Sequence, residues 1–182
     1  VGCKSGEAPV PETPAASAIA ETETERTEPA ASADPEHATE PDNEVEHLDY
    51  IELTTGGADS NTELPMLVVI HGYGDSPEGI SGLYRGLQVP VRLIMPRGPL
   101  PHPRGGHSWY DISSADYAAQ VEASTDRVAE LVEALADTRP TSTTMVSGFS
   151  QGGILSYELA AHHDGLFDVA FPIAGKLPNS EG

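Results

Sequence analysis

The chain has 182 residues, enough for one domain of ordinary size, and it carries 29 Asp and Glu side chains against 9 Lys and Arg. Its net charge of −20 repels nucleic acids and anionic membrane surfaces, so we expect no nucleic-acid partner. A single cysteine, Cys3, excludes an internal disulfide and a cysteine metal cluster, and no apolar run approaches the ~20 residues of a membrane-spanning helix.

The first 44 residues consist mainly of Pro, Ala, Glu, Thr and Ser, with few large apolar side chains. Such a segment cannot bury enough apolar surface to offset the entropy that ordering would cost. We therefore predict a disordered acidic linker over residues 1–44 and a folded region over residues 45–182.

The first three residues, Val1-Gly2-Cys3, resemble the end of a bacterial lipoprotein signal peptide, where a small residue precedes the cysteine that becomes lipidated. The apolar part of such a signal would precede residue 1. In this interpretation Cys3 is a membrane tether, and the acidic linker carries the folded region at the cell envelope. The alternative is an ordinary free thiol in a cytoplasmic protein. The sequence leaves both interpretations open.

Five segments predict β-strands. Continuous apolar runs are typical of strands that are covered on both faces, and Pro172 weakens the prediction for the last segment. The predicted strands are residues 45–54, 66–70, 91–95, 143–147 and 169–174.

Three segments between these strands predict helices. Apolar side chains recur at helical spacing over residues 115–137, a shorter glycine-rich segment covers 77–88, and a third helix runs from 151 to about 162. Alternation of strands and helices favours an α/β fold with right-handed βαβ units and a parallel sheet.

The segment Gly148-Phe149-Ser150-Gln151-Gly152 lies between a predicted strand and a predicted helix. In this position a G-x-S-x-G sequence resembles the nucleophile elbow of the α/β-hydrolases. The serine sits on a strained turn, and the glycines on either side remove side chains that would collide there. Ser150 is therefore the candidate nucleophile, at the N-terminal end of a helix that favours developing negative charge.

A second glycine-containing segment, His71-Gly72-Tyr73-Gly74-Asp75, directly follows the strand predicted at 66–70. Loops of this type supply half of the oxyanion hole in α/β-hydrolases. We expect the backbone N–H groups of Tyr73 and Gln151 to bind the oxyanion. His71 is expected to have a structural role rather than to act as the base, and Asp75 to anchor the loop.

Four segments together resemble the phospholipase/carboxylesterase branch of the α/β-hydrolases, which includes the acyl-protein thioesterases. They are residues 69–75, 96–99, 108–111 and 148–153. The resemblance implies a serine esterase that acts on a small ester or thioester substrate with no metal or organic cofactor. It also implies that Trp109 lies near an acyl pocket, although by sequence alone Trp109 could equally be a core aromatic residue.

The segments that carry this resemblance include neither the acid nor the base of a catalytic triad. A helix rises 1.5 Å per residue, which places His162 and His163 ~18 Å from Ser150, too far to take its proton. The resemblance places Asp and His after two later strands. The sequence therefore predicts an α/β-hydrolase fold whose C-terminal strands and helices are missing, and a 182-residue chain that is inactive alone.

The missing triad also leaves two alternatives open. The chain could be a natural short form, or a non-catalytic surface lipoprotein that uses the fold as a binding module. A base from His102 or His107 is disfavoured, because the Pro- and Gly-rich segment 99–107 is expected to be a mobile rim. The sequence does not indicate an oligomeric state.

Overall fold

The computed structural model describes residues 48–176. The predictions for the linker over residues 1–44 and for Cys3 lie outside the described residues. No helix within the described part is long and apolar enough to cross a membrane.

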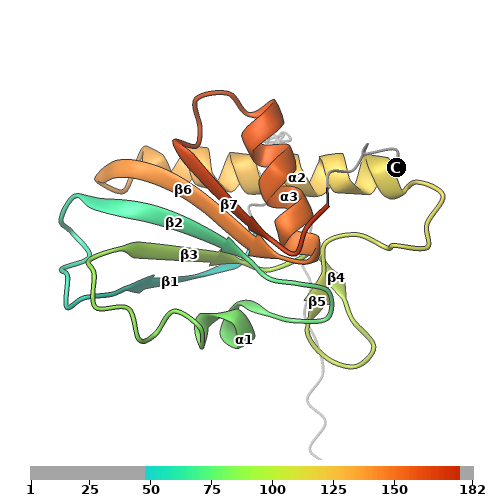
Figure 1. The fold of residues 1–182 in the computed structure, drawn as a ribbon, viewed down its shortest axis with the longest axis horizontal. Coiled ribbons are helices and arrows are strands. Elements are labelled where there is room, and N and C mark those ends of the chain that lie inside the picture. The colour runs from blue at the N-terminus through green and yellow to red at the C-terminus, as the bar shows by residue number, and fades with distance from the viewer. Residues whose placement is uncertain (1–47, 177–182) are drawn as a thin grey trace, which may run out of the picture. The chain divides into compact units, whose positions relative to one another are not determined.

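The centre of the fold is a five-stranded sheet with the strand order β1-β3-β2-β6-β7 (Figure 1). Its strands correspond to the five predicted segments, with ends shifted by a few residues. They are β1 (Tyr50–Thr54), β2 (Leu64–Ile70), β3 (Arg92–Pro96), β6 (Thr141–Phe149) and β7 (Val169–Ile173).

The α/β fold predicted from the sequence is confirmed, with a mostly parallel sheet in which the first strand is the exception. Strands β3, β2, β6 and β7 run parallel, whereas β1 pairs with β3 in the antiparallel direction. A parallel crossover needs a dozen or more residues, usually with a helix. The connection from Thr54 to Leu64 is shorter than that and contains no helix, so the first strand is not part of a βαβ unit.

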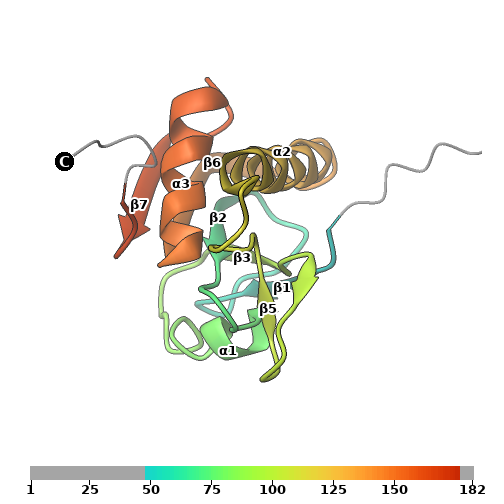
Figure 2. The ribbon, with the colours of Figure 1, turned by 90° about the vertical axis from the view of Figure 1, so that its right-hand side faces the viewer.

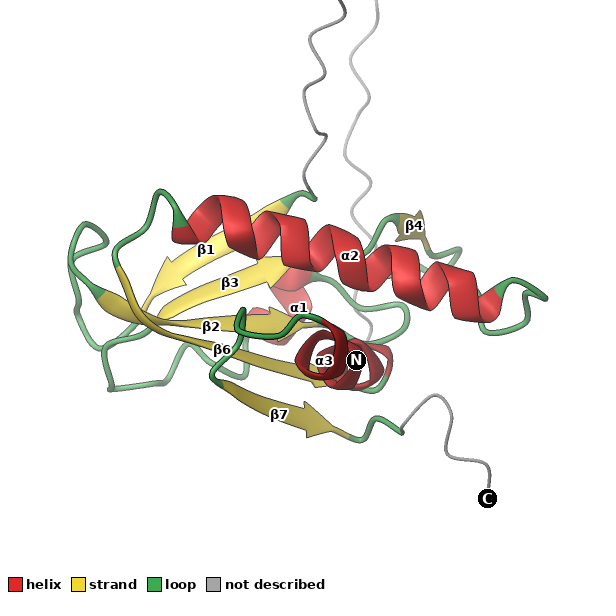
Figure 3. Cartoon of the chain, turned by 90° about the horizontal axis from the view of Figure 1, so that it is seen from above, coloured by secondary structure: helices red, strands yellow, loops and turns green. Residues whose placement is uncertain are grey.

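Helices lie on both faces of the sheet (Figures 2 and 3). Helices α2 (Tyr117–Ala136) and α3 (Gln151–His162) cover one face, and the short helix α1 (Pro77–Ser81) covers the other. Helix α1 ends well before the predicted residue 88, and Gly82 and Gly86 follow it in a turn region, as expected from the low helix propensity of glycine.

Two apolar clusters form the core, one on each face of the sheet. Neighbouring residues of β2 point to opposite faces, so Val68 belongs to the larger cluster under α2 and α3 and Val69 to the smaller cluster beside α1. Burial on both faces explains why the central strands are continuously apolar. The larger cluster includes Met66, Ile70, Ile94, Val128, Leu131, Val132, Val146, Leu155 and Leu159.

The segment predicted as a mobile rim is a β-hairpin, formed by β4 (Leu100–Pro101) and β5 (His107–Ser108). The backbone of His107 also pairs with the loop after β2. Its N–H donates to the Asp75 carbonyl oxygen (2.7 Å), and its own carbonyl oxygen accepts from the N–H of Gly74 (2.8 Å). The prediction of a mobile rim missed this pairing because backbone pairing leaves no clear pattern in so short a segment.

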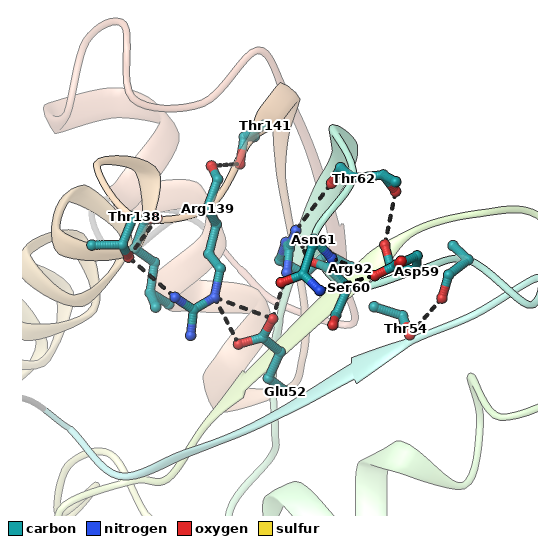
Figure 4. Close-up of polar contacts among 12 residues, drawn as sticks. Glu52, Thr54, Asp59, Ser60, Asn61, Thr62, Arg92, Thr138, Arg139 and Thr141 are labelled. Carbon is teal, nitrogen blue, oxygen red and sulfur yellow. Dashed lines mark hydrogen bonds and ion pairs between the residues drawn. The ribbon is translucent and has the colours of Figure 1, made fainter.

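An ion cluster joins three separate segments of the fold (Figure 4). The side chain of Arg92 is fully buried and donates to Glu52 of β1 and to the carbonyl oxygen of Ser60 (2.9 Å). Arg139, between α2 and β6, donates from Nε to the same carboxylate at 3.2 Å. Glu52 therefore neutralises the buried charge of Arg92, which without a partner would cost several kcal/mol of stability.

Replacement of Glu52 with glutamine is expected to lower the free energy of unfolding by about 2 kcal/mol. Removing one partner of a buried ion pair costs more than this, but the Glu52 side chain is 21% exposed and water offsets part of the loss. Urea unfolding of the complete protein measures the change.

The matched control for this prediction is Glu78→Gln. The Arg97 guanidinium, 2.6 Å away, holds the pKa of Glu78 at about 2, but this carboxylate is 54% exposed. An exposed pair of this kind contributes less than about 1 kcal/mol. Equal losses of stability in the two variants would contradict the role assigned to Glu52, which is to neutralise the buried Arg92.

Candidate active site

Ser150 lies in the sharp turn between β6 and α3, with φ 56° and ψ −110°. A non-glycine residue rarely adopts a positive φ, so this turn is strained. A Cβ atom at Gly148 would collide with the carbonyl group of Gly152, and a Cβ at Gly152 would collide with the carbonyl oxygen of Ile70. The glycines therefore allow β6, the start of α3 and the end of β2 to pack backbone against backbone.

The loop after β2 lies against this turn. A Cβ atom built at Gly72 would be 3.6 Å from the Cβ of Ser150 and 3.2 Å from Cδ1 of Phe149. The carboxylate of Asp75 accepts a hydrogen bond from the N–H of Ser76 (2.8 Å) and so holds the far side of the loop. The two motifs identified in the sequence are thus brought together.

Two backbone N–H groups in these two segments have no hydrogen-bond partner among the described residues. Among the hydrogen bonds formed within residues 48–176, none uses the N–H of Tyr73 or that of Gln151. Gln151 is the first residue of α3, where backbone N–H groups have no partner inside the helix. The predicted oxyanion hole requires that these two backbone N–H groups have no other hydrogen-bond partner.

Both ring nitrogens of His71 are occupied by the backbone. Nε2 accepts the N–H of Gly98 at 3.0 Å, and Nδ1 lies 2.8 Å from the carbonyl oxygen of Gly72. Because an amide N–H only donates and a carbonyl only accepts, the ring is neutral and carries its proton on Nδ1. Burial lowers the pKa of His71, which keeps the ring neutral. His71 therefore connects two loops and is not placed to accept a proton from Ser150.

The side chain of Gln151 connects the elbow to the segment after β5. Its Oε1 accepts from the N–H of Trp109 (3.0 Å), and its Nε2 donates to the carbonyl oxygen of Tyr110 (2.8 Å). Trp109 in turn donates from its indole N–H to the carbonyl oxygen of His71 (2.9 Å). The sequence predicted a role for the backbone of Gln151, whereas nothing in the local pattern indicated the role of its side chain.

A cavity of about 550 Å³ lies beside Ser150. Trp109 does not line this cavity. Its side chain is 1% exposed and packs in the larger core cluster, so Trp109 is a core aromatic residue and not part of an acyl pocket. The residues that line the cavity are Tyr73, Tyr110, Ile112, Tyr117, Ser150, Gln151, Ile154 and Lys176. Five of these residues were not predicted as site residues from the sequence, although Tyr110 lies in the segment 108–111 that carries the family resemblance.

The described histidines other than His71 also lie elsewhere. His162 pairs with Glu158 at 3.1 Å, and His163 pairs with Asp126 of α2 at 3.4 Å. The ring of His102 packs edge-on against Tyr73, with ring centroids 4.6 Å apart. None of these histidines lines the cavity beside Ser150, and within residues 48–176 no three His, Asp or Glu side chains form a group that could hold a metal ion.

A model of the phospholipase/carboxylesterase family matches residues 57–181. The chain belongs to the phospholipase/carboxylesterase family. This match spans both the loop after β2 and the elbow, so the candidate site lies within the part of the chain that defines the family. No curated protein matches the chain significantly.

Solved structures share the fold at low sequence identity. A carboxylesterase from Mesorhizobium loti is 21% identical, with a TM-score of 0.55, over 71% of this chain and 64% of that chain. A phospholipase/carboxylesterase from Dyadobacter fermentans is 19% identical, with a TM-score of 0.55, over 72% and 62%. A protein of unknown function from Agrobacterium tumefaciens is 18% identical, with a TM-score of 0.58, over 66% and 60%. The chain thus spans less than two-thirds of each of these structures.

Proposed function

We propose that the complete protein is a serine hydrolase that cleaves carboxylic esters or thioesters through an acyl-enzyme on Ser150. The observation that carries this proposal is the strained Ser150 turn, which lies against the Gly72 loop. The N–H groups of Tyr73 and Gln151, one in each of these segments, have no partner among the described residues. Backbone strain of this kind is costly and is typical of functional sites, whereas a binding module has no need of it.

In this mechanism Ser150 Oγ attacks the acyl carbon, and its proton passes to a histidine base. The carbonyl oxygen becomes an oxyanion that accepts hydrogen bonds from the N–H groups of Tyr73 and Gln151, each worth about 3 kcal/mol in the barrier. The tetrahedral intermediate collapses, the alcohol or thiol leaves with the proton, and water then releases the acyl group by the same steps.

The base and its orienting carboxylate are proposed to follow residue 182 in the complete protein. The apolar side chains of β7 support this proposal, because Val169, Phe171 and Ile173 are 39%, 52% and 49% exposed. In a complete protein, the apolar side chains of an edge strand are normally covered by another element, or the strand is paired with a further strand. A longer chain would supply both the cover and the two missing catalytic residues.

Reaction with a fluorophosphonate probe tests the proposal directly. We expect the complete protein to form one adduct, which mass spectrometry places on the peptide that contains Ser150, and heat-denatured protein to form none. The 182-residue chain alone should react about 10²–10⁴ times more slowly, because it lacks the general base. A folded complete protein that forms no adduct, or forms it on another serine, would disprove the assignment.

A further inference from the structure

The cavity beside Ser150 has an unexpected charge. The chain carries a net charge of −20, yet Lys176 is the one charged residue among the eight described residues that line this cavity. Lys176 follows directly after Gly175, which packs against Gly153 at the start of α3. The close packing of these two glycines holds the backbone before Lys176 next to the elbow.

Three acidic residues, Asp75, Asp111 and Asp116, lie within two residues of the lining residues, and none of them lines the cavity. Asp111 separates the lining residues Tyr110 and Ile112, but its Oδ1 accepts from both the N–H and the hydroxyl of Ser113, at 2.8 and 2.6 Å. Asp75 is bound to the N–H of Ser76. The carboxylate of Asp116 caps no backbone N–H of α2, and it too lies outside the cavity lining.

A ligand group in this cavity lies against Lys176 and against no lining carboxylate. Salt screens interactions between exposed charges beyond about 8 Å at physiological ionic strength. A ligand group in the cavity therefore interacts mainly with the residues that line it. An anionic group gains attraction there that the net charge of the whole chain does not remove.

Apart from Ser150 and Gln151, the remaining lining residues are aromatic or apolar: Tyr73, Tyr110, Ile112, Tyr117 and Ile154. We propose that the preferred substrates are esters that carry an anionic group, separated from the ester bond by a short apolar chain, and that this group pairs with Lys176. This inference rests on the proposed function, because it concerns the substrate of the same site. Lys176 would then be a specificity-determining residue that acts in binding and takes no part in the bond-breaking step.

The test compares half-esters of dicarboxylic acids with neutral esters of equal carbon number. The complete protein is assayed by alcohol release with the monoethyl esters of succinate, adipate and suberate against ethyl butyrate, hexanoate and octanoate. We expect kcat/KM to favour at least one half-ester over its neutral partner by about fivefold at low salt, the range of a partly exposed ion pair. Addition of about 0.5 M NaCl should reduce this preference by screening.

Substitution of Lys176 identifies the source of the preference. Lys176→Gln is expected to abolish the preference for half-esters, and Lys176→Glu is expected to reverse it. Arg85→Glu is the matched control, since it makes the same change of charge at a residue that does not line this cavity, and it should leave the preference intact.

The outcomes separate the two proposals. Equal activity on both ester classes, or equal losses on both classes in Lys176→Gln, would overturn the role of Lys176 while Ser150 still reacts with the fluorophosphonate probe. An inert protein that the probe does not label would instead overturn the proposed function.

Discussion

Replacement of Ser150 with alanine is expected to lower kcat/KM of the complete protein for esters by about 10⁵–10⁶-fold. Alanine keeps the Cβ atom and so tolerates the φ of 56° about as well as serine does. The variant removes only the attacking oxygen, and it leaves the backbone donors of Tyr73 and Gln151 in place. A residual rate above that in water should therefore survive.

The measurement is steady-state hydrolysis of an activated ester, with thermal unfolding recorded on the same samples. Ser147→Ala is the matched control, because Ser147 lies on the same strand and its hydroxyl donates to the carbonyl oxygen of Phe171 (2.8 Å). Its loss should cost about 1 kcal/mol of stability and little activity. If Ser150→Ala kept more than a tenth of the activity, Ser150 could not be the nucleophile.

The sequence predicted the elements of the fold whose cause is local. A strand buried on both faces must be apolar throughout, so the runs around Val68 and Val146 identified β2 and β6. The elbow was recognisable because a backbone approach this close requires glycine at 148 and 152. In each case the physical requirement acts on neighbouring residues and leaves a pattern.

Features that depend on distant partners were not predictable in this way. The direction of β1 is set by its pairing with β3, and the hairpin around His107 is held by the backbone of the Gly74 loop. The ion cluster joins Glu52 to Arg139, 87 residues later. Long-range contacts of this kind place no constraint on the residues next to them, so sequence patterns alone do not show them.

The position of Trp109 shows the same limit for the candidate site. Its ring packs 5.1 Å from His71, centroid to centroid, and its backbone N–H is held by Gln151. Trp109 therefore packs under the loop that carries the proposed oxyanion donor Tyr73. The cavity itself is lined by other residues. The site depends on this buried layer, because an oxyanion donor must be held in place before the reaction begins.

Gly152→Ala is expected to lower the free energy of unfolding by at least about 3 kcal/mol, the upper range for overpacking a core. Gly152 is the second residue of α3, where helix propensity alone would favour alanine by about 1 kcal/mol. The added methyl group, however, would collide with the carbonyl groups of Ile70 and His71. These are backbone atoms at the end of β2, so no side-chain rotation relieves the collision and the steric cost exceeds the gain in propensity.

Denaturant unfolding of the complete protein, with Gly86→Ala as control, measures this effect. A Cβ atom at Gly86 would meet no atom within 4 Å, and its φ lies outside the left-handed region, so that variant should be neutral or up to about 1 kcal/mol more stable. The collision at Gly152 also displaces the Gly72 loop from Ser150, so any folded Gly152→Ala protein should react with fluorophosphonate more slowly. A variant as stable and as reactive as the parent would show that α3 can move away from β2, and that the close approach of the elbow to the Gly72 loop is not required for the site.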